Sequence, residues 1–291
     1  MSSNIFRRRF RFAAAALGAA AALAFASAAA AQSRIAIDGS LGGEARTIAP
    51  NGPELFIPST DGRQRGEALF HSFSTFDLQA GDRAVFGTPP ETARIISRVT
   101  GNDGAFVDGT VRTDLRSGGV DFWMISPNGL VLGPNARIRT NGAVHLSTGD
   151  ALLFSDGETF SADPSAELTL TSAPPSAFGF NHAPARLELR GDGLEVVIDD
   201  VTLAGGSVEL RDARIGSSFG GQVLIAGAAA GDVVAVERRT VDALSTGPAT
   251  LGGEVRIVGD PTAPEEARTR VGFGGSGVVA LEGRRVRIDG A

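Results

Sequence analysis

After residue 31 the chain is dominated by short apolar runs in which hydrophobic and polar positions alternate or apolar residues follow one another directly. Each run has the length of a strand and is bounded by turn residues, which favours β-strands over helices. The clearest runs are Val120–Ile125, Leu187–Leu189, Val196–Ile198, Val233–Val236 and Val286–Ile288. Almost no window shows helical periodicity. The pattern predicts an all-β fold.

Turn signals punctuate these runs at close intervals. Ten Asn-Gly or Asp-Gly pairs occur, beginning at residues 38, 51, 61, 103, 108, 128, 141, 156, 192 and 289. Such pairs tolerate the positive φ angles of tight turns. The second half also contains a weak repeat, Gly-Gly-x-Val-x-(Leu/Ile), at residues 205–210, 220–225 and 252–257. A repeat of roughly twenty residues indicates a solenoid whose coils bury their apolar faces on one another.

Two β architectures fit these signals. A sandwich needs seven to nine strands and normally ends near ~100 residues per domain. A parallel β-helix accommodates any number of short strands and tolerates loops at its corners. The alternation in Val208-Glu209-Leu210 and Val255-Arg256-Ile257 supplies one inward and one outward face. We therefore expect a parallel β-helix of roughly ten coils, from about 20–25 residues per coil.

The first 31 residues differ from the rest. Arg7, Arg8, Arg9 and Arg11 precede an apolar run from Phe12 to Phe25, and Ala29-Ala30-Ala31 offers a small-residue cleavage site. This order predicts a secretory signal peptide at residues 1–31 rather than a membrane span. Sec export is favoured over twin-arginine export. Removing four arginines and no acid would change the net charge from −6 to −10.

Composition narrows the function further. The 291 residues include no cysteine and no lysine, so disulfide frameworks, thiolate zinc sites and cysteine nucleophiles are excluded. A chain this acidic is not expected to bind nucleic acid. The three histidines, His71, His145 and His182, lack metal-binding spacing, and no nucleophile elbow or phosphate loop occurs. We therefore expect no catalytic residue, no metal and no cofactor.

Four motifs in the first half carry a family resemblance. Phe70-His71-Ser72-Phe73-Ser74-Thr75-Phe76 resembles the Phe-His-Ser-Phe-x-x-Phe block of the filamentous haemagglutinin N-terminal domain, the secretion domain of two-partner secretion exoproteins. Ile95–Gly101, Asp108–Val111 and Phe122–Pro134 resemble three further motifs of that domain, in the same order. The resemblance extends from about residue 34 to residue 154.

The resemblance implies a fold and a function. The fold is a right-handed parallel β-helix with an N-terminal cap and extra-helical β-hairpins. The domains are a signal peptide at 1–31, the two-partner secretion domain core at 32–155, and continuing β-helical repeats at 156–291, which we expect to be the start of a longer or truncated passenger. The chain would be recognised by the periplasmic POTRA-type domains of an outer-membrane β-barrel transporter, exported to the cell surface or medium, and act as an adhesin on a receptor or glycan.

The resemblance also assigns transporter recognition to eight residues. These are Phe70, His71, Phe73, Ser126, Pro127, Asn128, Gly129 and Leu130. Ser126 replaces the first Asn of the family's Asn-Pro-Asn-Gly motif, and its hydroxyl is expected to accept a turn hydrogen bond. The residues alone leave another interpretation open, in which Phe70, Phe73 and Phe76 fill the core, His71 is a structural histidine and Trp123 is buried.

Other functions remain possible on the sequence. A secreted polysaccharide lyase or hydrolase would also use a β-helix, and it predicts a cleft with converging carboxylates and arginines. A toxin or contact-dependent inhibitor whose effector lies elsewhere is a third possibility. The adjacent acids Asp199-Asp200 and Glu265-Glu266 point to opposite faces of a strand and would not converge on one substrate.

Overall fold

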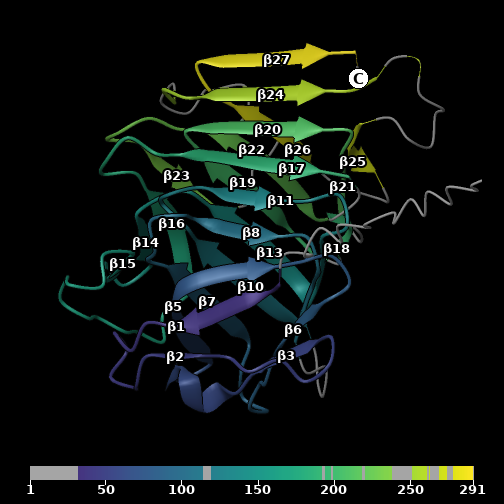
Figure 1. The fold of residues 1–291 in the computed structure, drawn as a ribbon. Helices are drawn as coiled ribbons and strands as arrows, with labels where there is room; N and C mark the ends of the chain where they lie inside the picture. Colours follow the sequence, from purple (N-terminus) through teal and green to yellow (C-terminus); the bar gives the residue numbers. More distant parts are fainter. Residues whose placement is uncertain are drawn as a thin grey trace, which may run out of the picture. The chain divides into compact units, whose positions relative to one another are not determined.

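A computed structural model describes residues 32–113, 119–191, 194–197, 199–217, 220–237, 251–260, 262, 269–273 and 278–290. Residues Gln32–Ala291 form one compact unit (Figure 1). The predicted signal peptide lies outside the described residues. Among the described residues, no helix has the length and apolar content that a membrane crossing requires.

Three stacks of parallel strands build this unit, and each full coil contributes one strand to each stack (Figure 1). The first stack contains the start of β5 (Ala68–Leu78), β7 (Arg94–Val99), β10 (Val120–Ile125), β13 (Asn141–Ser147), β19 (Val201–Gly205), β22 (Gln222–Gly227) and β26 (Val278–Glu282). The second contains the end of β5, β8 (Ala105–Val107), β11 (Leu130–Leu132), β17 (Arg186–Arg190), β20 (Ser207–Arg211), β24 (Glu254–Val258) and β27 (Arg285–Asp289). The predicted parallel β-helix is confirmed.

The third stack is split into two hydrogen-bonded sheets. One contains β3 (Glu54–Ile57), β6 (Arg83–Phe86), β9 (Thr110–Thr113) and β12 (Arg137–Arg139); the other contains β18 (Leu194–Val197), β21 (Arg214–Ser217) and β25 (Arg270–Phe273). Inward residues stay in register from coil to coil, as in the row Leu55, Ala84, Val111 and Ile138. This strict alternation produces a continuous apolar interior.

The expected number of about ten coils is wrong. Within the described residues the first stack has seven strands, because two long insertions use up chain length without adding coils. Residues 148–185 and the described residues 228–237 both leave the helix between the first and second stacks. They contribute β14 (Ala151–Phe154), β15 (Thr159–Ser161), β16 (Pro175–Gly179) and β23 (Val233–Ala235), which join in one antiparallel sheet. This sheet contains the predicted extra-helical hairpins.

A second apolar core lies between this hairpin sheet and the outer face of the first stack. Strand β10 shows the arrangement, since Phe122 and Met124 point into the helix while Trp123 and Ile125 join the outer core. Trp123 is 4% exposed and its ring lies 5.7 Å from that of Phe178 in β16. Burial of Trp123 is therefore confirmed. The run at 120–125 is apolar on both faces because it serves two cores.

The glycine repeat marks corners rather than coils. The copies at 205 and 252 precede β20 and β24, which are direct neighbours with Val208 opposite Val255. The copy at 220 precedes β22, in the first stack. Because one turn motif is used at two different corners, its spacing along the chain is irregular.

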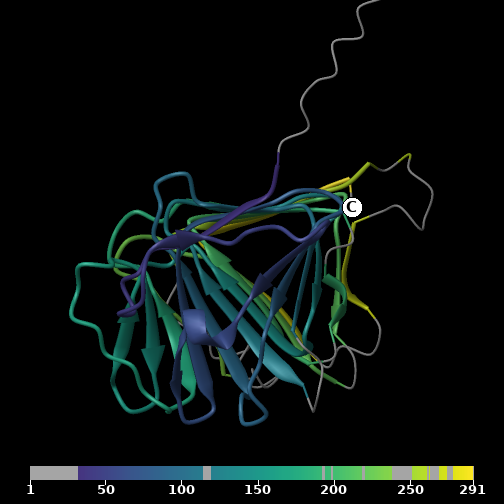
Figure 2. The same ribbon diagram turned by 60° about the horizontal axis from the view of Figure 1, so that its bottom comes forward.

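An N-terminal cap covers the first coil, as predicted. Strand β1 (Arg34–Ile37) pairs antiparallel with β5 and with β2 (Arg46–Thr47), and β4 (Arg63–Arg65) also pairs antiparallel with β5. A short 3₁₀ turn at Ser59–Asp61 completes the cap. Figure 2 shows these segments from the capped end.

Candidate functional site

Three of the four motifs meet at one corner of the helix, between the first and second stacks. Ser74, Gly101 and Asn128 occupy this corner in successive coils, and we call them the corner column. A Cβ on Gly101 would lie 2.0 Å from the carbonyl oxygen of Ser74, so only glycine allows the coils to approach this closely. The Asn128 side-chain amide donates to the Gly101 carbonyl oxygen at 3.1 Å. The motifs therefore encode contacts between neighbouring coils.

The remaining motif lies at the next corner, between the second and third stacks. Asp108 accepts hydrogen bonds from the backbone and side-chain nitrogens of Asn135 in the following coil, at 2.8 and 3.1 Å. Gly109 packs against the preceding coil, where a Cβ would lie 2.5 Å from the Asp82 carbonyl oxygen. The Asp-Gly-Thr motif thus forms the contacts between neighbouring coils at this corner, as the corner column does at the first corner.

The Ser126–Gly129 turn is closed by two hydrogen bonds. The Gly129 amide donates to the Ser126 carbonyl oxygen at 3.0 Å, and the Ser126 hydroxyl donates to the Gly129 carbonyl oxygen at 2.7 Å. We expected this hydroxyl to accept a turn hydrogen bond, and it donates one to a carbonyl oxygen instead. Ser126 and Leu130 are buried, Pro127 and Gly129 are half-buried, and Asn128 is exposed. The turn therefore offers its middle residues to solvent.

A groove of about 390 Å³ separates this turn from the hairpin loops. Its walls come from the corner, from the loop after β15 and from the loop after β16. The lining residues are Thr100, Pro127, Asn128, Thr148, Asp150, Ser161, Ala162, Asp163, Pro164, Asn181, His182, Ala183 and Pro184.

The carboxylates of the groove are already engaged. One oxygen of Asp150 accepts from the backbone and side chain of Asn181, at 3.0 and 2.7 Å. The other accepts from the backbone of His182 at 2.9 Å and lies 2.8 Å from its ring. Asp163 accepts from the backbone and hydroxyl of Ser165. These contacts hold the loops in place.

The aromatic block is buried, and its residues divide between the two cores. Phe73 and Phe76 lie in the helix interior, whereas Phe70 joins the outer core, with ring distances of 6.1 Å to Phe154 and 5.2 Å to Phe160. Alternation along β5 explains the division, because residues 70 and 73 must face opposite sides. The interpretation in which these rings fill cores is confirmed.

His71 lies inside the first coil with no hydrogen-bond partner for either ring nitrogen. Its ring stacks on Phe73 at 5.8 Å and meets Phe86 edge-on at 5.3 Å. Burial lowers the pKa of His71 to about 3, and it does the same to His145, which stacks on Trp123 at 3.7 Å. Both rings are therefore neutral and structural at neutral pH.

Sequence reasoning missed a buried polar network around Arg98. This side chain is 2% exposed and donates to the hydroxyls of Ser72 and Ser40, at 2.7 and 2.8 Å, and to the Ser161 carbonyl oxygen. Asp38 accepts from the hydroxyls of the same two serines.

Further contacts complete this network. The Thr100 hydroxyl also donates to Asp38, at 2.9 Å, and the Arg98 guanidinium carbon lies 4.7 Å from the ring centre of Phe160. Burial alone would raise the pKa of Asp38, but these hydroxyl donors outweigh it and leave the pKa lowered. The network joins the cap, two coils and the hairpin sheet. An arginine in the middle of an apolar strand was the signal in the sequence.

No group of three or more His, Asp or Glu side chains in the described part of the chain is arranged to hold a metal ion. The three histidines lie apart, in the first coil, beneath the hairpin sheet and at the groove.

Comparison with known protein families identifies this chain's relatives. The family model described as "TPS secretion domain" matches residues 33–256, which covers most of the chain and extends well past the last of the four motifs. No curated protein matches the chain.

Proposed function

The chain belongs to the TPS secretion domain family, the domain of two-partner secretion exoproteins, and we propose that its corner column and the adjoining groove are the surface that its transporter recognises. Membership makes the chain an exported protein with a cognate outer-membrane transporter as its partner. The observation that carries the proposal is the solvent exposure of the residues in the Ser126–Gly129 turn. Of the eight residues assigned to recognition, only Pro127, Asn128 and Gly129 reach the surface, and Pro127 and Asn128 also line the groove.

The buried members of the set act at an earlier stage. Phe70, His71 and Phe73 have no exposed surface in the folded chain, so a transporter contacts them only before the first coil forms. Folding of that coil then withdraws them from the partner and presents β5 as the template for β7. In this scheme residues 1–31 are the signal peptide, POTRA-type periplasmic domains bind the chain, and the N-terminal coils seed the β-helix.

The scheme fits the physics of a solenoid. Each coil contacts its neighbours alone, so coils can add one at a time to a finished template as the chain emerges. Absence of cysteine suits a chain that must stay extended in an oxidising compartment. We further propose an adhesin-like role for the exported protein, since the described groove carries no free pair of carboxylates of the kind that a lyase or hydrolase would need.

The test uses two matched asparagines. Asn128 and Asn135 are both exposed turn residues whose side-chain amides donate to the preceding coil, at 3.1 Å each, but they lie at different corners. The full chain and the variants Asn128→Ala and Asn135→Ala are expressed with and without the transporter, and the protein is assayed on intact cells and in the medium.

We expect transporter-dependent release for the native chain, a loss of several-fold for Asn128→Ala, and little change for Asn135→Ala at equal unfolding midpoints. Equal release of both variants would refute the recognition surface. Release of the native chain without the transporter would refute the secretion scheme and bring the glycan-degrading alternative forward.

A further inference from the structure

The outer face of the third stack carries an unusual set of side chains. Two outward rows run across strands β3, β6, β9 and β12, which lie in the half of the molecule nearest the cap (Figure 1). One row is Phe56, Val85, Arg112 and Arg139, and the other is Glu54, Arg83, Thr110 and Arg137. We call Phe56, Arg83, Arg112, Arg137 and Arg139 the basic face.

Its arginines are poorly neutralised. Arg83 and Arg139 are exposed and form no ion pair with any described residue, and the Arg137 guanidinium donates to the neighbouring Ala136 carbonyl oxygen at 2.6 Å. Arg112 reaches a single carboxylate, Glu54, at 3.5 Å. Arg112 and Arg139 also lie directly opposite each other in neighbouring strands, where like charges repel. A cluster of this kind stands out in a chain whose net charge is −6.

An exposed aromatic ring lies in the same row. Phe56 is 48% exposed, whereas Leu55 and Ile57 beside it are fully buried in the interior. Its ring covers Gly87 and continues the row toward Val85 and the arginines. Aromatic and arginine side chains are the types that contribute most to protein–protein binding, whereas charge alone would serve any polyanion.

The dimensions favour a narrow ligand. Four strands at ~4.8 Å spacing make a face about 14 Å long, and two rows make it about 7 Å wide. This area holds one extended segment of four or five residues rather than a whole domain surface. Guanidinium forks match carboxylates in paired geometry, and Phe56 requires an apolar neighbour.

We propose that the basic face binds an extended acidic segment of a partner protein, with carboxylates on Arg112 and Arg139 and an apolar side chain against Phe56. The basic face lies on a different stack from the groove. This proposal is therefore independent of transporter recognition through Asn128.

The test measures binding of a fluorescent decapeptide of alternating glutamate and leucine to the full chain by anisotropy, at low and at physiological salt. A lysine–leucine decapeptide is the ligand control. We expect saturable binding of the acidic peptide alone, a loss of at least tenfold in Arg112→Gln/Arg139→Gln, and a loss of about fivefold in Phe56→Ala. The matched control Arg34→Gln/Arg65→Gln removes two exposed arginines of the cap and should leave binding unchanged, as should Asn128→Ala.

Two outcomes would overturn the proposal. One is the absence of saturable binding of the acidic peptide by the native chain, or unchanged binding in Arg112→Gln/Arg139→Gln at the native unfolding midpoint. The other is tighter binding of a sulfated oligosaccharide or of phosphatidylglycerol vesicles that depends on Arg112 and Arg139 but not on Phe56, because that result describes a general anion surface.

Discussion

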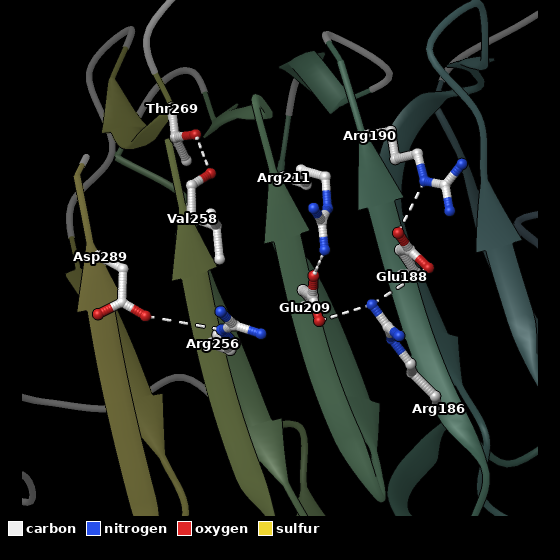
Figure 3. Close-up of polar contacts among 9 residues, drawn as sticks. All are labelled: Arg186, Glu188, Arg190, Glu209, Arg211, Arg256, Val258, Thr269 and Asp289. Carbon is white, nitrogen blue, oxygen red and sulfur yellow. Dashed lines mark hydrogen bonds and ion pairs between the residues drawn. The ribbon is translucent and has the colours of Figure 1, made fainter. Parts of the chain in front are cut away.

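The N-terminal coils (residues 68–139) and the C-terminal coils (residues 186–289) share one architecture but are held together differently. In the N-terminal coils polar side chains form buried contacts, as in the network that joins Arg98 to Ser72 and Asp38. In the C-terminal coils they lie on the outer face of the second stack (Figure 3). There Arg186 pairs with Glu188 at 3.3 Å and with Glu209 at 2.5 Å.

The interiors of the two regions also differ in the side chains that fill them. Phenylalanine rings fill the N-terminal interior, with Phe86 lying 6.2 Å from Phe73 and 5.6 Å from Phe122. Valine, leucine and isoleucine repeat in the C-terminal interior, as in the pairs Val208–Val255 and Leu210–Ile257. Large rings and a buried network admit one arrangement, while aliphatic rungs are nearly interchangeable. This difference explains why the four family motifs lie in the first half, although the fold continues beyond it.

The largest effect should follow from opening the buried network. Arg98→Met keeps the length of the side chain but removes the donor to Ser72, Ser40 and Ser161 and leaves the half-buried Asp38 without its nearby positive charge. We expect a loss of about 3–5 kcal/mol in the free energy of unfolding. The matched change in the C-terminal coils is Arg190→Met, which removes a half-exposed partner of Glu188 and should cost less than about 1 kcal/mol. Urea unfolding of both variants measures the difference. Equal costs would mean that the two regions do not differ.

The next effect concerns the corner between the first and second stacks, where both regions need glycine for neighbouring coils to approach closely. A Cβ at Gly101 would lie 2.0 Å from the Ser74 carbonyl oxygen, and one at Gly206 would lie 2.1 Å from that of Pro184, at the same corner farther along the helix. Gly101→Ala and Gly206→Ala should each cost about 2–3 kcal/mol, because neighbouring coils must separate. Gly43→Ala, where nothing lies within 4 Å, is the control for glycine itself. If Gly206→Ala is tolerated while Gly101→Ala is not, the corner constraint belongs to the N-terminal coils alone.

These corners show how far the sequence alone could lead. Alternation in runs such as Val208-Glu209-Leu210 was sufficient to predict strands with one inward and one outward face, because a period of two assigns each side chain to one face. Asn-Gly and Asp-Gly pairs predicted turns, and the described glycines at 39, 52, 104, 129, 157 and 290 do have positive φ. Gly62, Gly109 and Gly142 do not, and a Cβ at each of them would lie within 2.6 Å of a backbone atom, so their role is close approach of backbone.

What could not be predicted depends on distant contacts. Arg98 reaches Ser161, 63 residues away, through a sheet whose docking no local pattern specifies. In β5 the register with β1 shifts between Thr75 and Phe73, so the face on which Phe76 lies cannot be counted from Phe70. The groove forms only where the two hairpin loops return to the corner of the helix, and its residues are spread from Thr100 to Pro184.

Acid should also separate the two regions, with a smaller effect for each histidine than for each corner glycine. His71 and His145 have folded pKa values of about 3 and an ordinary value of 6.5, so the unfolded chain binds more protons than the folded chain below pH 6.5. Stability is therefore full above pH 6.5 and falls as the pH drops toward 3. At pH 5 each histidine should cost about 2 kcal/mol.

Both of these histidines lie in or beside the N-terminal coils, and the third, His182, is exposed at the groove. Hydrogen exchange at pH 5 should thus show faster opening of the N-terminal coils than at pH 7.5, with less change in the C-terminal coils. His71→Leu should remove about half of the loss. A uniform response along the chain, or no change in His71→Leu, would contradict this account.

The smallest effect tests the ladder of ion pairs in Figure 3. Arg186 is 45% exposed and bridges Glu188 and Glu209, two carboxylates that would otherwise repel each other in neighbouring strands. Burial alone would raise the pKa of Glu188, but its hydrogen bond to Arg190 and the charge of Arg186 outweigh it and leave the pKa lowered. Arg186→Gln should therefore cost about 0.5–1 kcal/mol at low salt.

The salt dependence of this small effect distinguishes exposed ion pairs from the buried network. Exposed pairs are screened at about 1 M salt, where the Debye length is about 3 Å, so the cost of Arg186→Gln should nearly vanish there. The cost of Arg98→Met should persist, because a buried network is screened far less. Arg285→Gln, in the exposed strand β27, is the control for loss of a surface arginine. If added salt weakens both effects equally, Arg98 is more accessible to ions than its burial indicates, and the two regions are held by the same kind of contact.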